Sequence, residues 1–158
     1  MLLHPAVWSA HGGRQGRAWL RDCLEEGLVL LDPTDDWRPL VVAADYVIGD
    51  HGSVTAYAAA IGRTVVRLAD RSESIAPGTA QDLVISSANP LDPDLPVAPQ
   101  LTGARAIDRR AVTAALSSRP GRADVLIRRT MYQLMGLTEP GRHRRSRPVP
   151  VPPSGGSG

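Results

Sequence analysis

Phenylalanine and lysine are absent from this 158-residue chain, and cysteine occurs once. Aromatic residues make up only 4% of the sequence, so a core must be built from Ala, Val, Leu and Ile. A lone Cys23 excludes an internal disulfide framework, and its place in a helical pattern favours a small buried residue over a reactive thiol. No apolar run approaches the ~20 residues of a membrane helix, and the N-terminus lacks the features of a signal peptide. We therefore expect a cytoplasmic protein.

Positive charge is unevenly distributed along the chain. Residues 1–139 carry fourteen Arg against sixteen Asp and Glu, whereas residues 140–158 carry four Arg and no acid. The first of these regions is not expected to bind nucleic acid specifically. The basic tail could make weak contact with the inner face of an anionic membrane, at about 1 kcal/mol for each Arg near the surface. The alternative, a solvated tail, is favoured.

Length and composition predict one folded domain and a tail. A chain of 158 residues is long enough for one domain with its own core. Residues 1–139 have ordinary globular composition, and we expect them to form a single Rossmann-like half-domain. Residues 140–158 are Pro, Arg, Ser and Gly with almost nothing to bury, which predicts a disordered tail.

The first half of the chain alternates short apolar segments with helical patterns. The segments expected to be strands are residues 1–3, 28–31, 46–48 and 64–68. Between them, a glycine-rich loop at 12–16 and three helices are expected, at residues 17–26, 35–44 and 54–61. Strands alternating with helices at this spacing predict an α/β fold with a doubly wound parallel sheet and right-handed crossovers.

The second half of the chain is less regular. Five prolines between residues 70 and 107 exclude long elements there, although residues 82–86 could form a short helix or an edge strand. Helical patterns return at residues 108–116 and 123–135, each preceded by turn residues. These two segments are the expected C-terminal helices.

The polar loop Asp50-His51-Gly52-Ser53 is the segment best suited to chemistry. It joins a predicted buried strand to a predicted helix, so unbonded N–H groups and the positive end of the helix dipole point into it. Gly52 allows an anion to approach the backbone, and the hydroxyls of Ser53 and Thr55 can donate to phosphate oxygens. Open α/β sheets bind ligands at this edge, outside the carboxyl ends of the strands.

Simpler interpretations of the same residues stay open. Asp50 or Ser53 could merely cap the helix, as Asp and Ser often do. His4 ends an earlier predicted strand, so His4 and His51 could face the same crevice and are the candidate catalytic groups. A zinc site is not expected, because the histidines and Asp50 lack its close, repeated spacing. Ser53 is not expected to be a hydrolase nucleophile, since its flanks are not Gly-x-Ser-x-Gly.

Two stretches together resemble the C-terminal half of GT-B-fold nucleotide-sugar enzymes, especially CDP-glycerol glycerophosphotransferases and UDP-N-acetylglucosamine 2-epimerases. They are Ala44-Asp45-Tyr46-Val47-Ile48-Gly49-Asp50-His51-Gly52-Ser53 and Ala58-Ala59-Ala60-Ile61-Gly62-Arg63-Thr64-Val65-Val66, after a segment that ends His4-Pro5. The resemblance implies a Rossmann-like half of a GT-B transferase that acts on cell-envelope polysaccharide. It also implies that Asp50, Gly52, Ser53 and Thr55 hold the diphosphate of a CDP- or UDP-type donor. His4 would line the active-site cleft, and no metal or cofactor is needed.

The sequence departs from these families at two places. They have an acid about four positions after the Gly/Ser pair, where this chain has Ala56, Tyr57 and Ala58. Arg63-Thr64 also replaces a basic residue followed by proline. In addition, GT-B enzymes react in the cleft between two halves, so this chain is expected to need an N-terminal half-domain or to self-associate. The alternative function is a non-catalytic pseudoenzyme or interaction module that keeps the fold.

Overall fold

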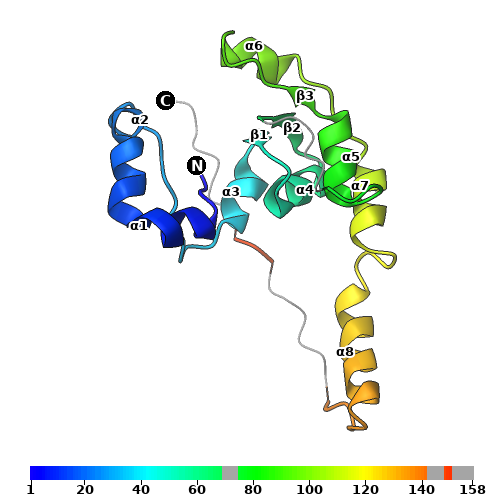
Figure 1. The fold of residues 1–158 in the computed structure, drawn as a ribbon. Coiled ribbons are helices and arrows are strands. Elements are labelled where there is room, and N and C mark those ends of the chain that lie inside the picture. The colour runs from blue at the N-terminus through cyan, green and yellow to red at the C-terminus, as the bar shows by residue number, and fades with distance from the viewer. Residues whose placement is uncertain (69–74, 142–147, 151–158) are drawn as a thin grey trace. The chain divides into compact units, whose positions relative to one another are not determined.

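The computed structural model describes residues 1–68, 75–141 and 148–150, and Figure 1 shows their mixed α/β fold. The chain divides into two compact units, residues 1–40 and 41–158. The first unit contains α1 (Pro5–Trp19) and α2 (Arg21–Glu25), and α3 (Arg38–Ala43) spans the boundary. The elements of the second unit are β1 (Tyr46–Gly49), α4 (Ser53–Ala60), β2 (Thr64–Arg67), α5 (Ala80–Ser87), β3 (Asn89–Pro90), α6 (Val97–Thr102), α7 (Arg109–Leu116) and α8 (Ala123–Leu134).

The described part of the second unit contains a small parallel sheet with the strand order β1-β2-β3. Tyr46 pairs with Thr64 and Gly49 with Arg67, so β1 and β2 are in register along their whole length. The shorter β3 extends the sheet beside the end of β2, where Arg67 pairs with Pro90. The carboxyl ends of β1 and β2 therefore lie side by side at one edge, as the sequence predicted for these two strands.

Alanine and valine form the core of the second unit. Val65 and Val66 of β2 are both fully buried, which is the continuous apolar pattern of a parallel strand covered on both faces. Helix α4 packs on β1 and β2, and α5 and α7 pack on α4 and on each other (Figure 1). The small buried side chains of α4 allow this close packing; they are Ala56, Ala58 and Ala59. The expected core of Ala, Val, Leu and Ile is confirmed for Ala, Val and Ile, whereas no leucine is among the buried residues described.

Glycines end several helices where the sequence predicted them. Gly62 follows α4 with φ +85°, and its N–H donates to the carbonyl of Ala59 at 2.9 Å. The N–H of Arg63 donates to the carbonyl of Ala58, also at 2.9 Å, which completes a Schellman motif. Gly27 ends α2 in the same way, with φ +95°. Only glycine adopts these left-handed conformations at no steric cost.

Two of the predicted strands do not form, and this is the main correction to the expected fold. Residues 1–3 and 28–31 are extended but are not part of a sheet. Met1 donates to the carbonyl of Val29 and accepts from the N–H of Leu31 at 3.0 Å, the pattern of a single parallel bridge. One bridge gives these apolar segments too few ladder bonds to make a strand pair.

The glycine-rich segment after His4 is a helix and not the expected loop. Pro5 occupies the first helical position, where its missing N–H costs nothing, and the His4 side chain caps the helix. Gly12 alone is non-helical, with φ 76° and ψ 155°, and kinks α1 there. A further expectation for this unit was wrong, since Cys23 is exposed and is not the small buried residue that the helical pattern favoured.

The C-terminal half follows the sequence more closely. Residues 82–86 lie in α5, so the helical alternative holds, and Thr79 caps this helix by accepting from the N–H of Asp82 at 3.2 Å. The predicted C-terminal helices are confirmed as α7 and α8. Most of the predicted disordered tail lies outside the described residues. Its first residue, Pro140, accepts a hydrogen bond from Arg128 through its carbonyl.

Candidate functional site

The β1–α4 loop follows the carboxyl end of β1 and begins with an ordered turn. Asp50 Oδ1 accepts a hydrogen bond from the N–H of Gly52 at 2.7 Å, which closes the loop into an Asx-type turn. A Cβ atom on Gly52 would lie 2.9 Å from this carboxylate oxygen, so a larger residue there would displace the end of the Asp50 side chain. The Asp50 carboxylate therefore shapes the loop from within.

Gly52 is the N-cap residue of α4, with φ −69° and ψ 161°. Neither Asp50 nor Ser53 caps the helix, because Ser53 is already its first residue and Asp50 bonds outside it. The N–H groups of the first turn belong to Ser53, Val54 and Thr55. No hydrogen bond among the described residues engages these three donors. The positive end of the helix thus carries open donors at the carboxyl edge of the sheet.

Two hydroxyl groups flank these donors. The Ser53 side chain is exposed, and no hydrogen bond within the described residues involves its hydroxyl. Thr55 is only 5% exposed, the single buried polar residue among those described, and its hydroxyl likewise has no partner there. The Thr55 oxygen itself keeps some contact with solvent, so it is open to an external acceptor. Both hydroxyls belong to the turn that carries the open N–H groups.

Thr55 also sets the close approach of α4 to β1. A Cβ atom on Gly49 would lie 2.5 Å from Thr55 Oγ1, so this oxygen lies directly over the last residue of β1. The strand and the helix can approach this closely only because residue 49 has no side chain. The Thr55 hydroxyl consequently lies where the strand ends and the loop begins.

The other end of α4 is held by α7. Arg109 Nε donates to the carbonyl of Ala60 at 3.0 Å, and Thr113 Oγ1 donates to the same oxygen at 3.4 Å. A cationic donor at a helix C-terminus complements both the open carbonyl and the helix dipole. These bonds fix the direction of α4, and so the direction in which its first turn points.

The two candidate catalytic histidines differ in their surroundings. His51 is exposed in the β1–α4 loop, next to Asp50 and Gly52. His4 belongs to the first unit, where its Nδ1 accepts a hydrogen bond from the N–H of Ala6 at 3.1 Å and caps α1. Five of the six predicted site residues therefore come together at the β1–α4 loop, and His4 has a structural role of its own.

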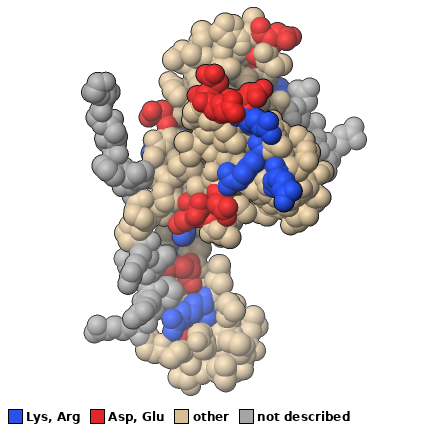
Figure 2. Space-filling model, turned by 90° about the vertical axis from the view of Figure 1, so that its left-hand side faces the viewer, with Lys and Arg blue, Asp and Glu red and all other residues tan. Residues whose placement is uncertain are grey.

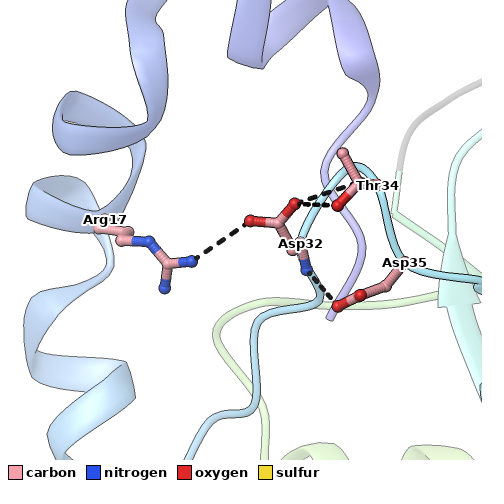
Figure 3. A network of polar contacts seen from close by, with 4 residues as sticks. All are labelled: Arg17, Asp32, Thr34 and Asp35. Carbon is pink, nitrogen blue, oxygen red and sulfur yellow. Dashed lines mark hydrogen bonds and ion pairs between the residues drawn. The ribbon is translucent and has the colours of Figure 1, made fainter.

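Acidic side chains of the first unit are occupied by local hydrogen bonds (Figure 3). Asp32 accepts from the hydroxyl of Thr34 at 2.8 Å and from its N–H at 3.1 Å, and these bonds hold the pKa of Asp32 below its usual value. Arg17 lies 3.9 Å from the same carboxylate, and Asp35 accepts from the N–H of Asp32 at 3.3 Å. This network orders the turn before α3.

Asp36 is bound in a similar way by Arg38. The guanidinium donates to both carboxylate oxygens, at 2.8 and 2.7 Å, which lowers the pKa of Asp36 and raises the pKa of Arg38. Nowhere in the described parts of the chain do three His, Cys, Asp or Glu side chains gather as metal ligands would. On the face drawn in Figure 2, acidic and basic side chains lie in small neighbouring groups.

One residue of this edge was not identified from the sequence. Arg67 ends β2 and pairs in register with Gly49, the residue before the loop. The N–H of Leu68 donates to the carbonyl of Gly49 at 2.8 Å, which continues the pairing by one residue. A cationic side chain thus follows the neighbouring strand to the same edge. The place of Arg67 beside the loop depends on the strand register, which the sequence does not reveal.

Comparison with protein-family models, with curated proteins and with solved structures found no significant match. None of the helices within residues 1–68, 75–141 and 148–150 is both long and apolar enough to cross a membrane.

Proposed function

We propose that the β1–α4 loop binds the diphosphate group of a nucleotide-activated donor, of the nucleotide-sugar or CDP-polyol type. The observation that carries this proposal is the first turn of α4. Its three N–H donors and two hydroxyls have no partner among the described residues, and they follow a parallel strand at its carboxyl end. Donors arranged in this way at a helix N-terminus are suited to phosphate oxygens.

In this proposal the residues of the loop have separate roles. Ser53 and Thr55 donate hydrogen bonds to phosphate oxygens, together with the first-turn N–H groups. Gly52 leaves the backbone open to the anion, and Asp50 holds the loop in shape through the Gly52 N–H. The Asp50 carboxylate is itself an acceptor, so it orders the phosphate contacts and does not supply one.

The reaction class follows from the resemblance stated above. We infer that the chain is the donor-binding half of a GT-B-like glycosyltransferase or glycerophosphotransferase, whose Rossmann-like sheet includes β1, β2 and β3. His51, exposed beside the anion-binding turn, is the candidate acid or base at this site. The open N–H groups stabilise negative charge on the leaving nucleotide, which is a nucleoside diphosphate in glycosyl transfer and CMP in the transfer of glycerol phosphate; this is the part that a donor-binding half contributes.

A second candidate function is a non-catalytic module that keeps the fold. Tyr57 favours it, because the resembled families have an acid near this position to bind ribose hydroxyls. Tyr57 is exposed, and no acid lies in the first turn of α4. Such a module would bind a diphosphate with little preference for the nucleoside attached to it.

The proposal is tested by titrating the purified chain with CDP, UDP, CDP-glycerol and a UDP-sugar in a calorimeter. Ser53→Ala should weaken the affinity about tenfold, since a charge-assisted hydrogen bond is lost. The melting temperature should stay nearly unchanged, because Ser53 does not cap α4. The control is Ser87→Ala, which removes an exposed hydroxyl from a different helix. If no titrant binds, or if Ser53→Ala lowers stability without changing affinity, the proposed site is wrong.

A further inference from the structure

Arg67 lies where a second anionic group of the same ligand would be bound. It is the last residue of β2, and its backbone pairs with Gly49, from which the β1–α4 loop begins. Neighbouring strands in a sheet are about 4.8 Å apart, so Arg67 is one strand away from the loop. Its side chain is partly buried, and it also takes part in other interactions of the chain.

The register indicates which face of the sheet Arg67 occupies. Paired residues of neighbouring parallel strands direct their Cβ atoms to the same face. A Cβ atom on Gly49 would point at Thr55 of α4, so this is the face that α4 covers. The side chain of Arg67 therefore leaves the backbone on the α4 face, at the end of the sheet next to the first turn of α4.

The Thr55 side chain is a second polar feature at this point, and its oxygen keeps some contact with solvent. Thr55 is 95% shielded from solvent, as its 5% exposure shows, and its oxygen lies over Gly49 without a partner among the described residues. The position of Arg67 is inferred from the strand pairing. The position of the Thr55 side chain is shown by its burial and by the approach of its oxygen to Gly49. Both place a group that binds anions at the junction of β1 and α4.

We propose that Arg67 is a ligand-binding residue that selects diphosphates over monophosphates at the β1–α4 loop. This inference rests on the proposed function and adds the residue that binds the second phosphate. One phosphate accepts hydrogen bonds from the first turn of α4, and the other pairs with the Arg67 guanidinium. A guanidinium can donate two parallel hydrogen bonds to one phosphate, which makes the second contact strong and directional. A monophosphate reaches only one of the two sites.

The same strand provides a matched control. Arg63 lies just before the amino end of β2, and Arg67 lies at its carboxyl end. Both side chains are partly buried. Replacing either one by Gln removes one positive charge and keeps the length of the side chain nearly unchanged. A general loss of positive charge would affect both variants alike, whereas a contact with the second phosphate depends on Arg67 alone.

The test compares CDP with CMP, and UDP with UMP, on the wild type, Arg67→Gln, Arg67→Lys and Arg63→Gln. We expect the wild type to bind the diphosphates at least about tenfold more tightly than the monophosphates. Arg67→Gln should abolish most of this preference while monophosphate affinity changes little. Arg67→Lys should restore part of it, and Arg63→Gln should behave as the wild type. Thermal unfolding of each variant shows whether it is folded.

The outcomes separate this inference from the proposed function. If Ser53→Ala weakens binding but Arg67→Gln keeps the full preference for diphosphates, the loop binds phosphate and the role of Arg67 is wrong. Equal losses in Arg67→Gln and Arg63→Gln would also overturn it. If Arg67→Gln does not fold, Arg67→Lys is used in its place. A folded Arg67→Lys variant with the same diphosphate affinity and the same preference for diphosphates as the wild type would contradict the proposal. An absence of binding by the wild type would overturn both proposals.

Discussion

Gly49 is a residue at which the structure makes a sharp prediction. Its missing side chain leaves room for Thr55 Oγ1, which would lie 2.5 Å from a Cβ atom at position 49. We expect Gly49→Ala to lower the free energy of unfolding by about 1–3 kcal/mol, because the strand or the helix must move to relieve this overlap. Urea denaturation monitored by circular dichroism measures the loss.

A double-mutant cycle tests the cause. Thr55→Ala removes the oxygen, and the nearest remaining atom of residue 55 would then be its Cβ, 3.5 Å from the new methyl group. This is an ordinary van der Waals distance. The double variant should therefore lose less stability than the sum of the two single variants. Additive losses would show that Gly49 is required for another reason.

Single residues differ in how far the sequence reveals their roles. The loop at Asp50–Ser53 was predictable because an apolar segment, a glycine and a helix start are local signals. The predicted burial of the strand was wrong, since Tyr46 and Ile48 of β1 are exposed. The N-cap residue of α4 was not predictable. The helix begins at Ser53, one residue earlier than expected, so that Gly52 and not Ser53 is the N-cap. From the sequence alone, Arg67 is only a polar residue near the end of a predicted strand. Only the pairing of Gly49 with Arg67 gives it a place beside the loop.

At the scale of elements, the direction of α4 depends on contacts at its far end. Arg109 donates to the carbonyl of Ala60 at 3.0 Å. We expect Arg109→Ala to lower the free energy of unfolding by about 1 kcal/mol, because the last turn of α4 loses a cationic donor. Arg110→Ala is the control, since Arg110 is exposed on the same helix and its side chain forms no hydrogen bond within the described residues. Equal losses in the two variants, measured by urea denaturation, would argue against a specific cap.

Elements were predictable where local signals agreed with packing. β1, α4, β2, α7 and α8 combine apolar segments with turn residues or glycine stops, and all of them form. The segments at residues 1–3 and 28–31 have the apolar character of strands, but a strand requires a continuous ladder, and the described residues supply a single bridge. In α1, a capping side chain and a proline at the first position outweigh the glycines that predicted a loop.

At the scale of the whole molecule, the two compact units contribute unequally to the proposed site. The second unit holds the sheet, the first turn of α4, which is proposed to bind the anion, and Arg67. The first holds His4, whose Nδ1 already accepts the bond that caps α1. The proposed donor binding therefore uses residues of the second unit alone. Placing an acceptor is a separate task, and none of the residues assigned above performs it.

The last prediction is that the purified chain binds a donor but does not transfer its activated group efficiently. In the GT-B reaction one half binds the donor and the other presents the acceptor across a cleft. Positioning two reactants can account for ~7–11 kcal/mol of the barrier, which donor binding alone does not supply. We therefore expect, at most, slow hydrolysis of the donor. Chromatographic assay of donor and products over many turnovers measures this.

Adding a separately expressed N-terminal half of a GT-B transferase provides the comparison. If the chain is a donor-binding half, the complemented mixture should form transfer product, and Ser53→Ala should reduce it in step with the loss of donor affinity. If the chain is a non-catalytic module, donor binding should persist and complementation should produce nothing. Multiple-turnover transfer by the chain alone, shown by sedimentation to be a monomer, would contradict the assignment. The acceptor would then have to be placed by residues of this chain, and the first unit, with His4, would be where to look for them.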